Sequence, residues 1–494
     1  MTVERNKAAV WNSTNEVGYN ALRAGRYAAF LSDAQQARLE RIRQARMLFD
    51  GQHREYYLDE KRSQFNFCQS LVQGELVRVY TSFNVLGLTS RKFADPLFGE
   101  APVLQCDEPT QKTFLDDLVR RCSLASMAHG MAADCSYEGE AFVESMIWQG
   151  RAWVRQVPAD EIWPEGELQP DGQYQSFVRY ALDNAGTSEK PVWLLLRIRY
   201  TAGAIERTLA QLGDDGKIAR EGLDLAQWPA MKAGQVTLEP LTPTGIQRNT
   251  ITWVPNMLVR GAARSDYDGS PLKLQDQLNG QHTLLANVLA KHGEPPVAAP
   301  QEAADATGNA RAEHKLWWYT DPERIPKYIV RDLQLEGVMA AAKNVLANLL
   351  IDLEMSAVLL GLQEGSQVDA WRKLKLNAQN ALKKAARKAA YWSGGLLRAV
   401  EVAQDLEQTI PGVRYDRTPI GVEIRDGIPD DPVDRANEQA TLRAAGLLSR
   451  RRGLMAQLGD AAAVDAEMSE LDSESARETP SVLLDEPGED ESEI

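Results

Sequence analysis

The spacing of apolar residues changes from a helical to a strand-like pattern near residue 140. Leu39, Ile42 and Leu48 recur at helical spacing until Asp50-Gly51 ends the pattern. Residues 66–83 and 113–138 show further helical patterns, and Gly139 marks a turn into a strand. From about residue 141 to 255, short runs rich in β-branched and aromatic residues are separated by turn sequences such as "QPDGQ". This stretch predicts a small antiparallel sheet.

A long helix is predicted immediately after this region. Ser270 suits the N-cap and Pro271 the first helical position, while Gly293 and the following Pro-Pro pair end the helix. Its apolar seam is narrow because the steps alternate between four and three residues and one member is polar. The members of this seam are Leu274, Leu278, Gln281, Leu285 and Val288. A helix with such a narrow apolar seam is expected to pack against neighbouring helices on its flanks rather than in a wide core.

The rest of the chain is predicted to be mostly helical. A second long helix follows an excursion of about forty residues, and Gly361 with Gly365 permits a tight loop after it. The next helix runs to about Leu406, and we expect a kink at Ser393–Gly395. A strand-like "GVEIRDG" and three short helices complete the pattern. The fold class is therefore predicted as α+β, predominantly helical.

Composition and charge narrow the functional class. The 494 residues are 44% hydrophobic and 25% charged, with four cysteines that form no Cys-x-x-Cys pair. The N-terminus lacks a signal-peptide pattern, and no run of eighteen apolar residues occurs. We expect a reduced protein that is neither secreted nor inserted in a membrane.

The net charge of −15 is concentrated at the C-terminus. Residues 465–494 carry twelve acids and one Arg, a net of −11, so residues 1–464 carry −15 + 11 = −4. The acidic end, residues 473–494, is predicted to be a disordered tail. The folded body is nearly neutral.

No motif supports catalysis or cofactor binding. The sequence contains no phosphate-binding loop, zinc-binding helix or nucleophile elbow, and its only two histidines on one predicted helix, His282 and His292, do not share a face. We therefore predict no enzyme activity, no cofactor and no metal site.

Two clusters are candidates for binding. The stretch from residue 372 to 389 has seven Lys or Arg and no acid, which suits contact with phosphates, although a solvated helix or a docking face for an acidic neighbour explains it equally well. Its candidate residues are Lys373, Lys375, Lys383, Lys384, Arg387 and Lys388. The aromatic run Trp317, Trp318 and Tyr319 suits a partner surface, with core packing as the alternative.

Five stretches, in this order, resemble the portal proteins of tailed bacteriophages, over roughly residues 40 to 465. They are "LFDGQHREYY", "DCSYEGEAFVES", "SDYDGSPLKLQDQLNGQHTLLANVLAKHGEPPVAAP", "SAVLLGLQEGSQVDAWRKLKLNA" and "DGIPDDPVDRANEQATLRAAGLLSRRRGLMAQLGD". The chain departs from the family at "SQVDAW", where Ser-Gly-x-Ala is frequent. The order of the stretches carries the resemblance more than any one of them.

The resemblance implies a division of the chain. Residues 1–265 form a wing of helices and a small antiparallel sheet, and residues 266–292 and 329–354 form two stem helices around a clip at residues 293–328. A tunnel loop at residues 355–366 leads to a long kinked wing helix and a returning strand at residues 367–428. A crown at residues 429–472 and the acidic tail at residues 473–494 complete the chain.

The resemblance also implies a function. Portal subunits form a dodecameric ring at the unique capsid vertex, assembled in the bacterial host cytoplasm, through which double-stranded DNA is packaged and ejected. The clip, with Trp317, Trp318 and Tyr319, would contact the large terminase subunit and then a head-tail adaptor, while the ring meets the major capsid and scaffolding proteins. The tunnel-loop residues facing DNA would be Leu362, Gln363, Glu364, Gly365 and Ser366.

Two other functions stay open at this point. A monomeric enzyme acting on nucleic acid would use the basic stretch at residues 372–389. A capsid scaffold or adaptor without a channel would share the location in the virion but form no axial hole.

Overall fold

The computed structural model describes residues 28–57, 80–187, 189–293, 297–300, 316–319, 335–362, 371–424, 432–458 and 461–478. The chain divides into two compact units, residues 1–427 and 428–494. The first unit mixes helices and sheets, so the predicted α+β composition is confirmed, while the described part of the second unit is helical.

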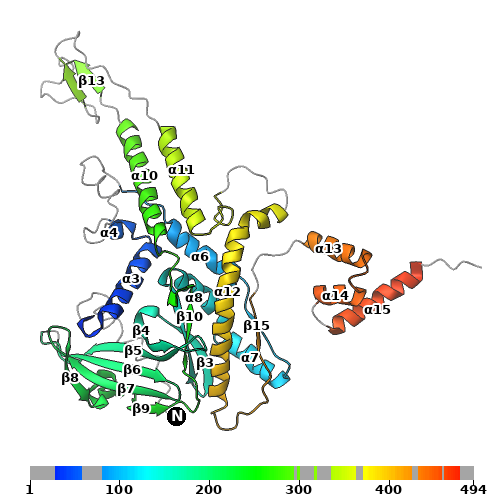
Figure 1. Cartoon of the computed structure of the whole chain (residues 1–494), viewed down its shortest axis with the longest axis horizontal. Coiled ribbons are helices and arrows are strands. Elements are labelled where there is room, and N and C mark those ends of the chain that lie inside the picture. The colour runs from blue at the N-terminus through cyan, green and yellow to red at the C-terminus, as the bar shows by residue number, and fades with distance from the viewer. Residues whose placement is uncertain are drawn as a thin grey trace, which may run out of the picture. The chain divides into compact units, whose positions relative to one another are not determined.

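Helices form the N-terminal part of the first unit (Figure 1). After the short helix η1 (Ala28–Phe30), helix α3 (Asp33–Phe49) begins at a capping box in which Ser32 and Gln35 satisfy each other's backbone N–H groups. The other helices here are α4 (His53–Tyr57), α6 (Val85–Phe98), α7 (Pro109–Arg121) and α8 (Leu124–Glu138). Gly139 ends α8 at a φ of +91°, as the predicted turn requires.

One predicted helix is wrong at its C-terminal end. Residues 80–84 are not helical, because Thr81 and Phe83 direct backbone hydrogen bonds to side chains of a distant helix. Residues 66–79 of the same prediction lie outside the described residues.

The predicted antiparallel region forms two sheets. The first has the order β10 (Ile251–Pro255), β2 (Glu140–Trp148), β3 (Arg151–Val157). The second joins β4 (Ile162–Leu168), β5 (Tyr174–Asn184), β6 (Trp193–Thr201), β7 (Ala204–Leu212) and β8 (Ile218–Leu223), with β9 (Leu241–Pro243) also paired to β7. Every pair within these two sheets is antiparallel.

Three short strand pairs complete the described sheet structure. β11 (Leu258–Val259) and β12 (Ala262–Ala263) form a hairpin, and β1 (Val103–Gln105) pairs with the returning strand β15 (Gly421–Glu423). β13 (Val297–Pro300) and β14 (Leu316–Tyr319) pair in parallel.

The long helix α12 (Trp371–Glu407) packs along the three-stranded sheet (Figure 1). Trp392, Leu396 and Val400 on this helix join one hydrophobic core with Val154 and Val254 of the sheet. Phe98 of α6 meets Trp392 edge to face at 5.3 Å between ring centroids. This core fixes the helix to the sheet along much of its length.

The predicted kink at Ser393–Gly395 does not break the helix, because α12 is helical without interruption through these residues. Gly395 is required instead for close packing: a Cβ at this position would lie 2.4 Å from Cγ2 of Val254. Gly394 has nothing within 4 Å of the equivalent position. Gly395, and not Gly394, therefore lets the helix approach the strand closely.

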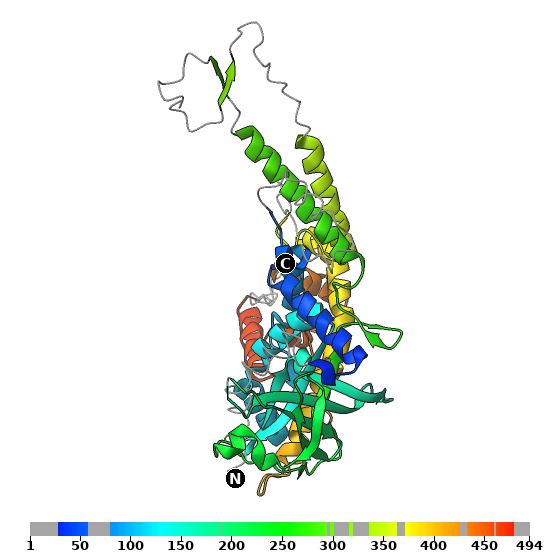
Figure 2. The same ribbon diagram turned by 90° about the vertical axis from the view of Figure 1, so that its left-hand side faces the viewer.

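Helices α10 (Ser270–Gly293) and α11 (Leu335–Asp352) lie side by side and extend from the end of the unit opposite the six-stranded sheet (Figures 1 and 2). α10 extends one residue beyond the prediction at each end, because Ser270, the predicted N-cap, is its first residue and Gly293, the predicted stop, is its last. It does not begin at residue 266. Their shared core includes Leu278, Leu349 and Leu353, so α11 of the same chain fills part of the narrow apolar seam.

The second unit contains α13 (Pro432–Ala444), α14 (Arg450–Leu458) and α15 (Ala461–Glu478). Arg450 pairs with Asp472 at 3.2 Å, and Arg451 pairs with Asp465 at 2.9 Å, which ties α14 to α15. The prediction of a disordered tail from residue 473 places its start too early. Residues 473–478 continue α15, and they include good helix formers such as Ala, Arg and Glu. Residues 479–494 lie outside the described residues.

Arg46 connects α3 to α8 and to the start of the second sheet. Arg46 donates to Asp160 at 2.7 Å and to Glu138 at 2.5 Å. Burial raises the pKa of Glu138 to about 8, although Arg46 acts in the opposite direction. The folded protein therefore holds the Glu138 proton at pH values where the unfolded chain has released it.

The Gly394–Gly395 pair provides a matched test of packing. Both Gly→Ala changes gain about 1 kcal/mol of helix propensity, but only Gly395→Ala forces a methyl group into buried Val254. We expect Gly394→Ala to leave stability unchanged or raise it, and Gly395→Ala to lower it by about 1–3 kcal/mol in urea unfolding. Equal effects of the two changes would contradict this assignment.

The raised pKa of Glu138 predicts a pH dependence. Its contribution to stability is fully present below the unfolded pKa of about 4.3, falls by at most about 1.4 kcal/mol per pH unit as pH rises, and is lost above about 8. We expect Glu138→Gln to reduce this slope between pH 5 and 8 in unfolding titrations. An unchanged slope would show that Glu138 is ionised throughout this range.

Candidate functional site

The structure describes only part of the predicted tunnel loop and clip contact. Leu362 is exposed at the end of the turn that follows α11, whereas residues 363–366, predicted to face DNA, lie outside the described residues. The backbone of residues 317–319 lies in β14, and the side chains of Trp317, Trp318 and Tyr319 lie outside the described residues.

The basic stretch divides into exposed and buried residues. Lys383 and Arg387 are exposed, and the side chains of Lys373 and Lys375 lie outside the described residues. The candidates Lys384 and Lys388 are buried, so neither ammonium group can face a phosphate. Lys384 and Lys388 fit the alternative of a docking face for an acidic neighbour. The acidic residue belongs to the same chain.

Asp266 is this acidic neighbour. Its carboxylate is buried, and Oδ1 lies 3.0 Å from Nζ of Lys384. The second oxygen, Oδ2, accepts hydrogen bonds from Nζ of Lys388 and from Oγ of Ser136, the latter at 2.6 Å. Both ammonium groups also lie over the ring of Phe93, at 4.4 and 4.7 Å from its centroid. We call Asp266, Lys384 and Lys388 the ion cluster.

The charges in the ion cluster depend on one another. Burial alone would raise the pKa of the Asp266 carboxyl, but Lys388 and Lys384 outweigh it and hold the pKa well below its usual range. Burial lowers the pKa of Lys388, and Asp266 opposes that effect. Removal of either partner would leave a buried charge without compensation.

The ion cluster fixes both helices of the extended pair to α12. Asp266 lies four residues before Ser270, where α10 begins. Nζ of Lys384 also donates to the carbonyl of Leu353, just past the end of α11, at 2.8 Å. Glu354, which has a φ of +54°, forms an ion pair with the exposed Arg387. One face of α12 therefore holds the entry to α10 and the exit from α11.

The polar side of α10 faces the segment before α6. Gln275 donates to the carbonyl of Phe83 at 2.7 Å, and Asn279 accepts from the N–H of Phe83 at 3.2 Å. Thr283 both accepts from the N–H of Thr81 and donates to its carbonyl, each at 3.0 Å. These buried polar residues satisfy an extended backbone within the same chain.

Apolar side chains nevertheless remain exposed on the pair of helices. Ile351 is 73% exposed and Met339 is 48% exposed on α11, and Leu289 is 52% exposed on α10. We call these three residues together the apolar face, although Met339 and Ile351 point about 120° apart around α11 and so lie on two sides of the helix pair. No part of the described chain buries them.

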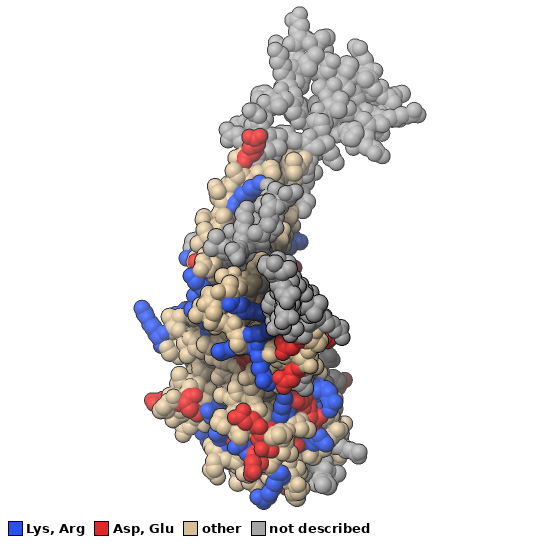
Figure 3. Space-filling view, turned by 90° about the vertical axis from the view of Figure 1, so that its right-hand side faces the viewer, with Lys and Arg blue, Asp and Glu red and all other residues tan. Residues whose placement is uncertain are grey.

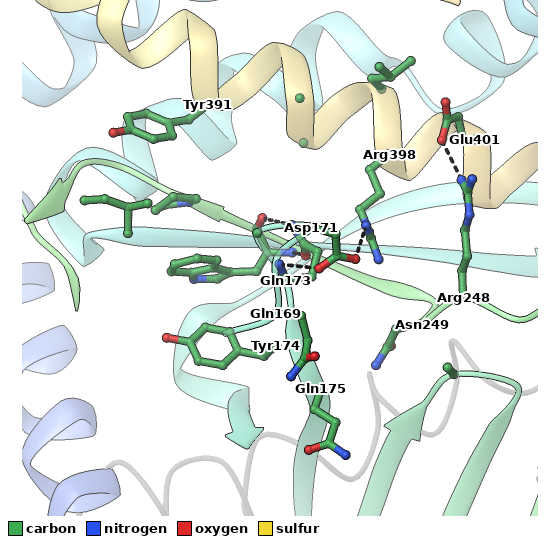
Figure 4. A pocket seen from close by; sticks show the side chains of 18 of the residues that line it. Gln169, Asp171, Gln173, Tyr174, Gln175, Arg248, Asn249, Tyr391, Arg398 and Glu401 are labelled. Atoms are coloured by element: carbon green, nitrogen blue, oxygen red, sulfur yellow. Dashed lines mark hydrogen bonds and ion pairs between the residues drawn. The ribbon is translucent and has the colours of Figure 1, made fainter. Parts of the chain in front are cut away.

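An open groove of about 860 Å³ lies beside α12 (Figure 4). One wall is the turn between β4 and β5, and the other includes α12 from Ala390 to Glu401. Arg398 pairs with Asp171 at 2.7 Å, and Arg248 pairs with Glu401 at 2.6 Å. Both cations of the groove are therefore neutralised.

Sequence reasoning missed the groove and the ion cluster. Asp266 does stand in the quoted stretch "SDYDGSPLKLQ", but nothing in its local pattern indicates a partner 122 residues away. The sequence does contain one indication that Lys384 and Lys388 share a buried face. The two lysines are four residues apart on a helix, and most of their neighbours are alanines.

Lys and Arg are interspersed with Asp and Glu on the face shown in Figure 3. Among the described residues, no group of three His, Cys, Asp or Glu could hold a metal ion. Within the same residues, none of the helices combines the length and apolar character needed to cross a membrane.

Comparisons with known proteins gave structural likenesses only. No family model and no curated protein matches the chain. The chain is similar to a chain from the neck of a native gene transfer agent (GTA) particle computed with C12 symmetry, with 13% identity and a TM-score of 0.39, covering 80% of this chain and 94% of that one.

Two further likenesses come from the same kind of particle. One is to a chain from the neck of an empty GTA particle computed with C6 symmetry, with 13% identity and a TM-score of 0.37. The other is to a chain from the virion of a native GTA particle, with 12% identity and a TM-score of 0.36. Each covers 80% of this chain and 94% of the other.

The ion cluster predicts a large difference between mutations of two carboxylates that pair with α12. Asp266→Ala leaves two ammonium groups buried, and we expect it to lower stability by about 3–5 kcal/mol in urea unfolding. Glu354→Gln removes the exposed partner of Arg387 and should cost less than about 1 kcal/mol. Near-equal losses would mean that the ion cluster does not hold the helices.

Proposed function

We propose that this chain is the subunit of a portal ring at the unique vertex of a tailed-phage-like capsid. In this proposal α10 and α11 are the stem helices, the segment around β13 and β14 is the clip, the three helices of the second unit are the crown, and the rest is the wing. Identical copies would assemble into a dodecamer with an axial channel.

The apolar face is the observation that carries this proposal. Ile351, Met339 and Leu289 stay exposed although α11 and residues 80–86 already cover other sides of α10. Full burial of one such side chain contributes about 1.5–3 kcal/mol. In a closed ring of heterologous contacts each copy has a neighbour on either side, so exposed residues on two sides of the helix pair are buried in every copy at once.

The charge pattern supports a conduit for DNA. Residues 1–464 carry a net charge of only −4, and acids and bases are interspersed on the face shown in Figure 3. A strongly basic lining would release many counterions on binding DNA and would hold the duplex where it must slide. In the proposed tunnel loop, residues 355–366, Met355 and Ser356 are buried, so the part from Leu362 onward would contact the duplex at the narrowest point of the channel.

The proposed partners follow from this role. The clip, including Trp317, Trp318 and Tyr319, would dock the large terminase subunit during packaging and a head-tail adaptor afterwards. The wing would meet the major capsid and scaffolding proteins during assembly in the bacterial host cytoplasm. The packaging motor would supply the energy, and this chain would catalyse no reaction.

The alternative of a monomeric nucleic-acid enzyme loses support from the basic stretch. Lys384 and Lys388 are committed to Asp266, which leaves Lys383 and Arg387 as the exposed cations described there. A scaffold or adaptor without a channel would share most surface properties, and imaging of an axial hole separates it from a portal.

The ring proposal predicts that charge on the apolar face blocks assembly. Particle images and native mass spectrometry should show closed rings with an axial hole for the wild-type chain. We expect Ile351→Glu to reduce the ring fraction by about tenfold or more, because burying an unpaired carboxylate costs several kcal/mol. Leu241→Glu on β9 is the control, since Leu241 is 56% exposed but lies outside the apolar face.

Two outcomes would contradict the proposal. One is a stable wild-type monomer under every condition tested. The other is normal ring formation by Ile351→Glu with loss of rings by Leu241→Glu, which would move the subunit interface to the six-stranded sheet.

A further inference from the structure

The side chain of His53 is buried where α4 meets α10 and the segment before α6, and the portal proposal gives it no role. We propose that His53 is a pH-sensitive switch. Its neutral ring holds α4 and residues 80–86 against α10, and uptake of a proton releases α4 from that helix. This inference rests on hydrogen bonds within one chain, and it holds whether or not the protein forms a ring.

Two hydrogen bonds connect α4 to α10. At the start of α4, Nδ1 of His53 lies 2.9 Å from Nδ2 of Asn279. At its end, the hydroxyl of Tyr57 donates to the carbonyl of Leu272 at 2.8 Å. Helix α4 has five residues, which is too few for a stable isolated helix. Its position therefore depends on these hydrogen bonds and on its buried side chains.

Backbone groups fix the direction of each hydrogen bond that leads to His53. The N–H of Leu86 can only donate, so the atom of Gln275 that it meets at 3.3 Å is the amide oxygen. The amide nitrogen of Gln275 then donates to the carbonyl of Phe83 at 2.7 Å and to Oδ1 of Asn279 at 2.9 Å. The N–H of Phe83 also donates to Oδ1 of Asn279, at 3.2 Å. The amino group of Asn279 is therefore the end that faces His53.

The protonation state of His53 follows from this orientation. An amide NH2 group carries donors only, so the ring nitrogen that it meets must accept. Nδ1 of His53 is therefore without a proton, and the ring is neutral with its proton on Nε2. The amino group of Asn279 also donates to the hydroxyl of Tyr80 at 3.2 Å. The closed arrangement thus requires the neutral ring.

A second proton on His53 would replace this attraction by repulsion. The protonated Nδ1 and the amino group of Asn279 would both be donors, and neither could bond to the other. The cationic ring would also be buried, because the side chain of His53 is 0% exposed in the closed arrangement. Release of α4 returns water to the ring, so protonation favours the open form.

The other titratable side chains at this junction do not offset the cost. They are carried by the residues just before α4 and α6 and by the adjacent parts of α4, α6 and α10, and none of them is among the groups that shift the pKa of His53. The single acid of α10, Asp276, is buried one turn before Asn279. These side chains are Asp50, Arg54, Glu55, Tyr56, Tyr57, Tyr80, Arg91, Lys273, Asp276 and His282.

The pH range of the switch follows from the burial of the ring. Burial lowers the pKa of His53 from its ordinary value of 6.5, against smaller opposing effects of the Asn84 side chain and the Leu48 carbonyl. The released ring titrates near 6.5, so the closed form is fully favoured above that pH. As the pH falls further, the open form takes up the proton first, and the opening equilibrium constant rises by up to about tenfold per pH unit until the closed ring is protonated too.

A second histidine at the junction acts in the same direction. The ring of His282 on α10 packs against that of Phe83 at 6.1 Å between centroids. Burial lowers the pKa of His282 as well. Its protonation therefore also favours separation of residues 80–86 from α10.

Hydrogen exchange in the full-length chain at pH 7.5 and pH 5.5 tests the switch. After correction for the intrinsic rate at each pH, exchange in peptides covering residues 52–57 and 80–86 should be about tenfold faster at the lower pH, while peptides of α8 stay protected. Equal loss of protection in α8 would indicate general acid unfolding and would overturn the proposal. Glu138 cannot produce the expected change, because its raised pKa stabilises the fold as the pH falls.

A glutamine at position 53 separates the titration from the hydrogen bond. His53→Gln keeps a side-chain oxygen that can accept from Asn279 but has no group that titrates in this range, so it should remove most of the tenfold change. His129→Gln is the matched control, since His129 lies on α8 and pairs with Asp95 at 3.1 Å, and it should keep the change. The same pH dependence in the wild type and in His53→Gln would contradict the switch.

The pKa of His53 can also be measured in the wild-type protein. The pH profile of exchange at the histidine C2–H, followed by mass spectrometry, should show that His53 titrates below 6.5. A value of 6.5 or above would overturn the proposal even if the variants fail to fold. Native mass spectrometry at both pH values reports on rings separately, and a chain that forms no rings but shows the switch would contradict only the portal proposal.

Discussion

The buried pairing of Asp266 with Lys384 and Lys388 is the interaction on which the arrangement of the first unit depends. It brings together the residues just before α10, the residues just after α11 and the middle of α12, three parts of the chain that no sheet hydrogen bond connects. Because removal of any one charge leaves the others buried and uncompensated, the three parts are held as one body. Stability and specific geometry therefore have the same origin here.

The mixed polarity of α10 follows from its two kinds of neighbour. Its apolar residues, such as Leu278, share a core with α11, and its buried polar residues Gln275, Asn279 and Thr283 bind the backbone of residues 81–86. A helix that must satisfy an irregular chain segment needs side-chain donors and acceptors where a helix in an ordinary core carries leucine. The surface of α10 that is left for contact with other molecules is consequently smaller than the sequence pattern indicates.

Local chemistry made much of the fold predictable. The ends of α10 and the turn at Gly139 depend on neighbours a few residues away. The turn lies where it is predicted, and α10 extends only one residue beyond the prediction at each end. The roles of Lys384, Lys388 and Gly395 were not predictable, because each depends on a partner more than a hundred residues away in sequence. A run of lysines looks solvated, and a glycine pair in a helix looks like a kink, until the opposing strand or carboxylate is known.

The close approach at Gly395 also has a mechanical consequence. Because only a residue without a Cβ fits against Val254, α12 cannot slide by one residue along β10 without a clash. Beyond the bend near its N-terminal end (Figure 1), α12 is therefore locked lengthwise against the sheet at Gly395, so the helix and the three-stranded sheet move as one piece.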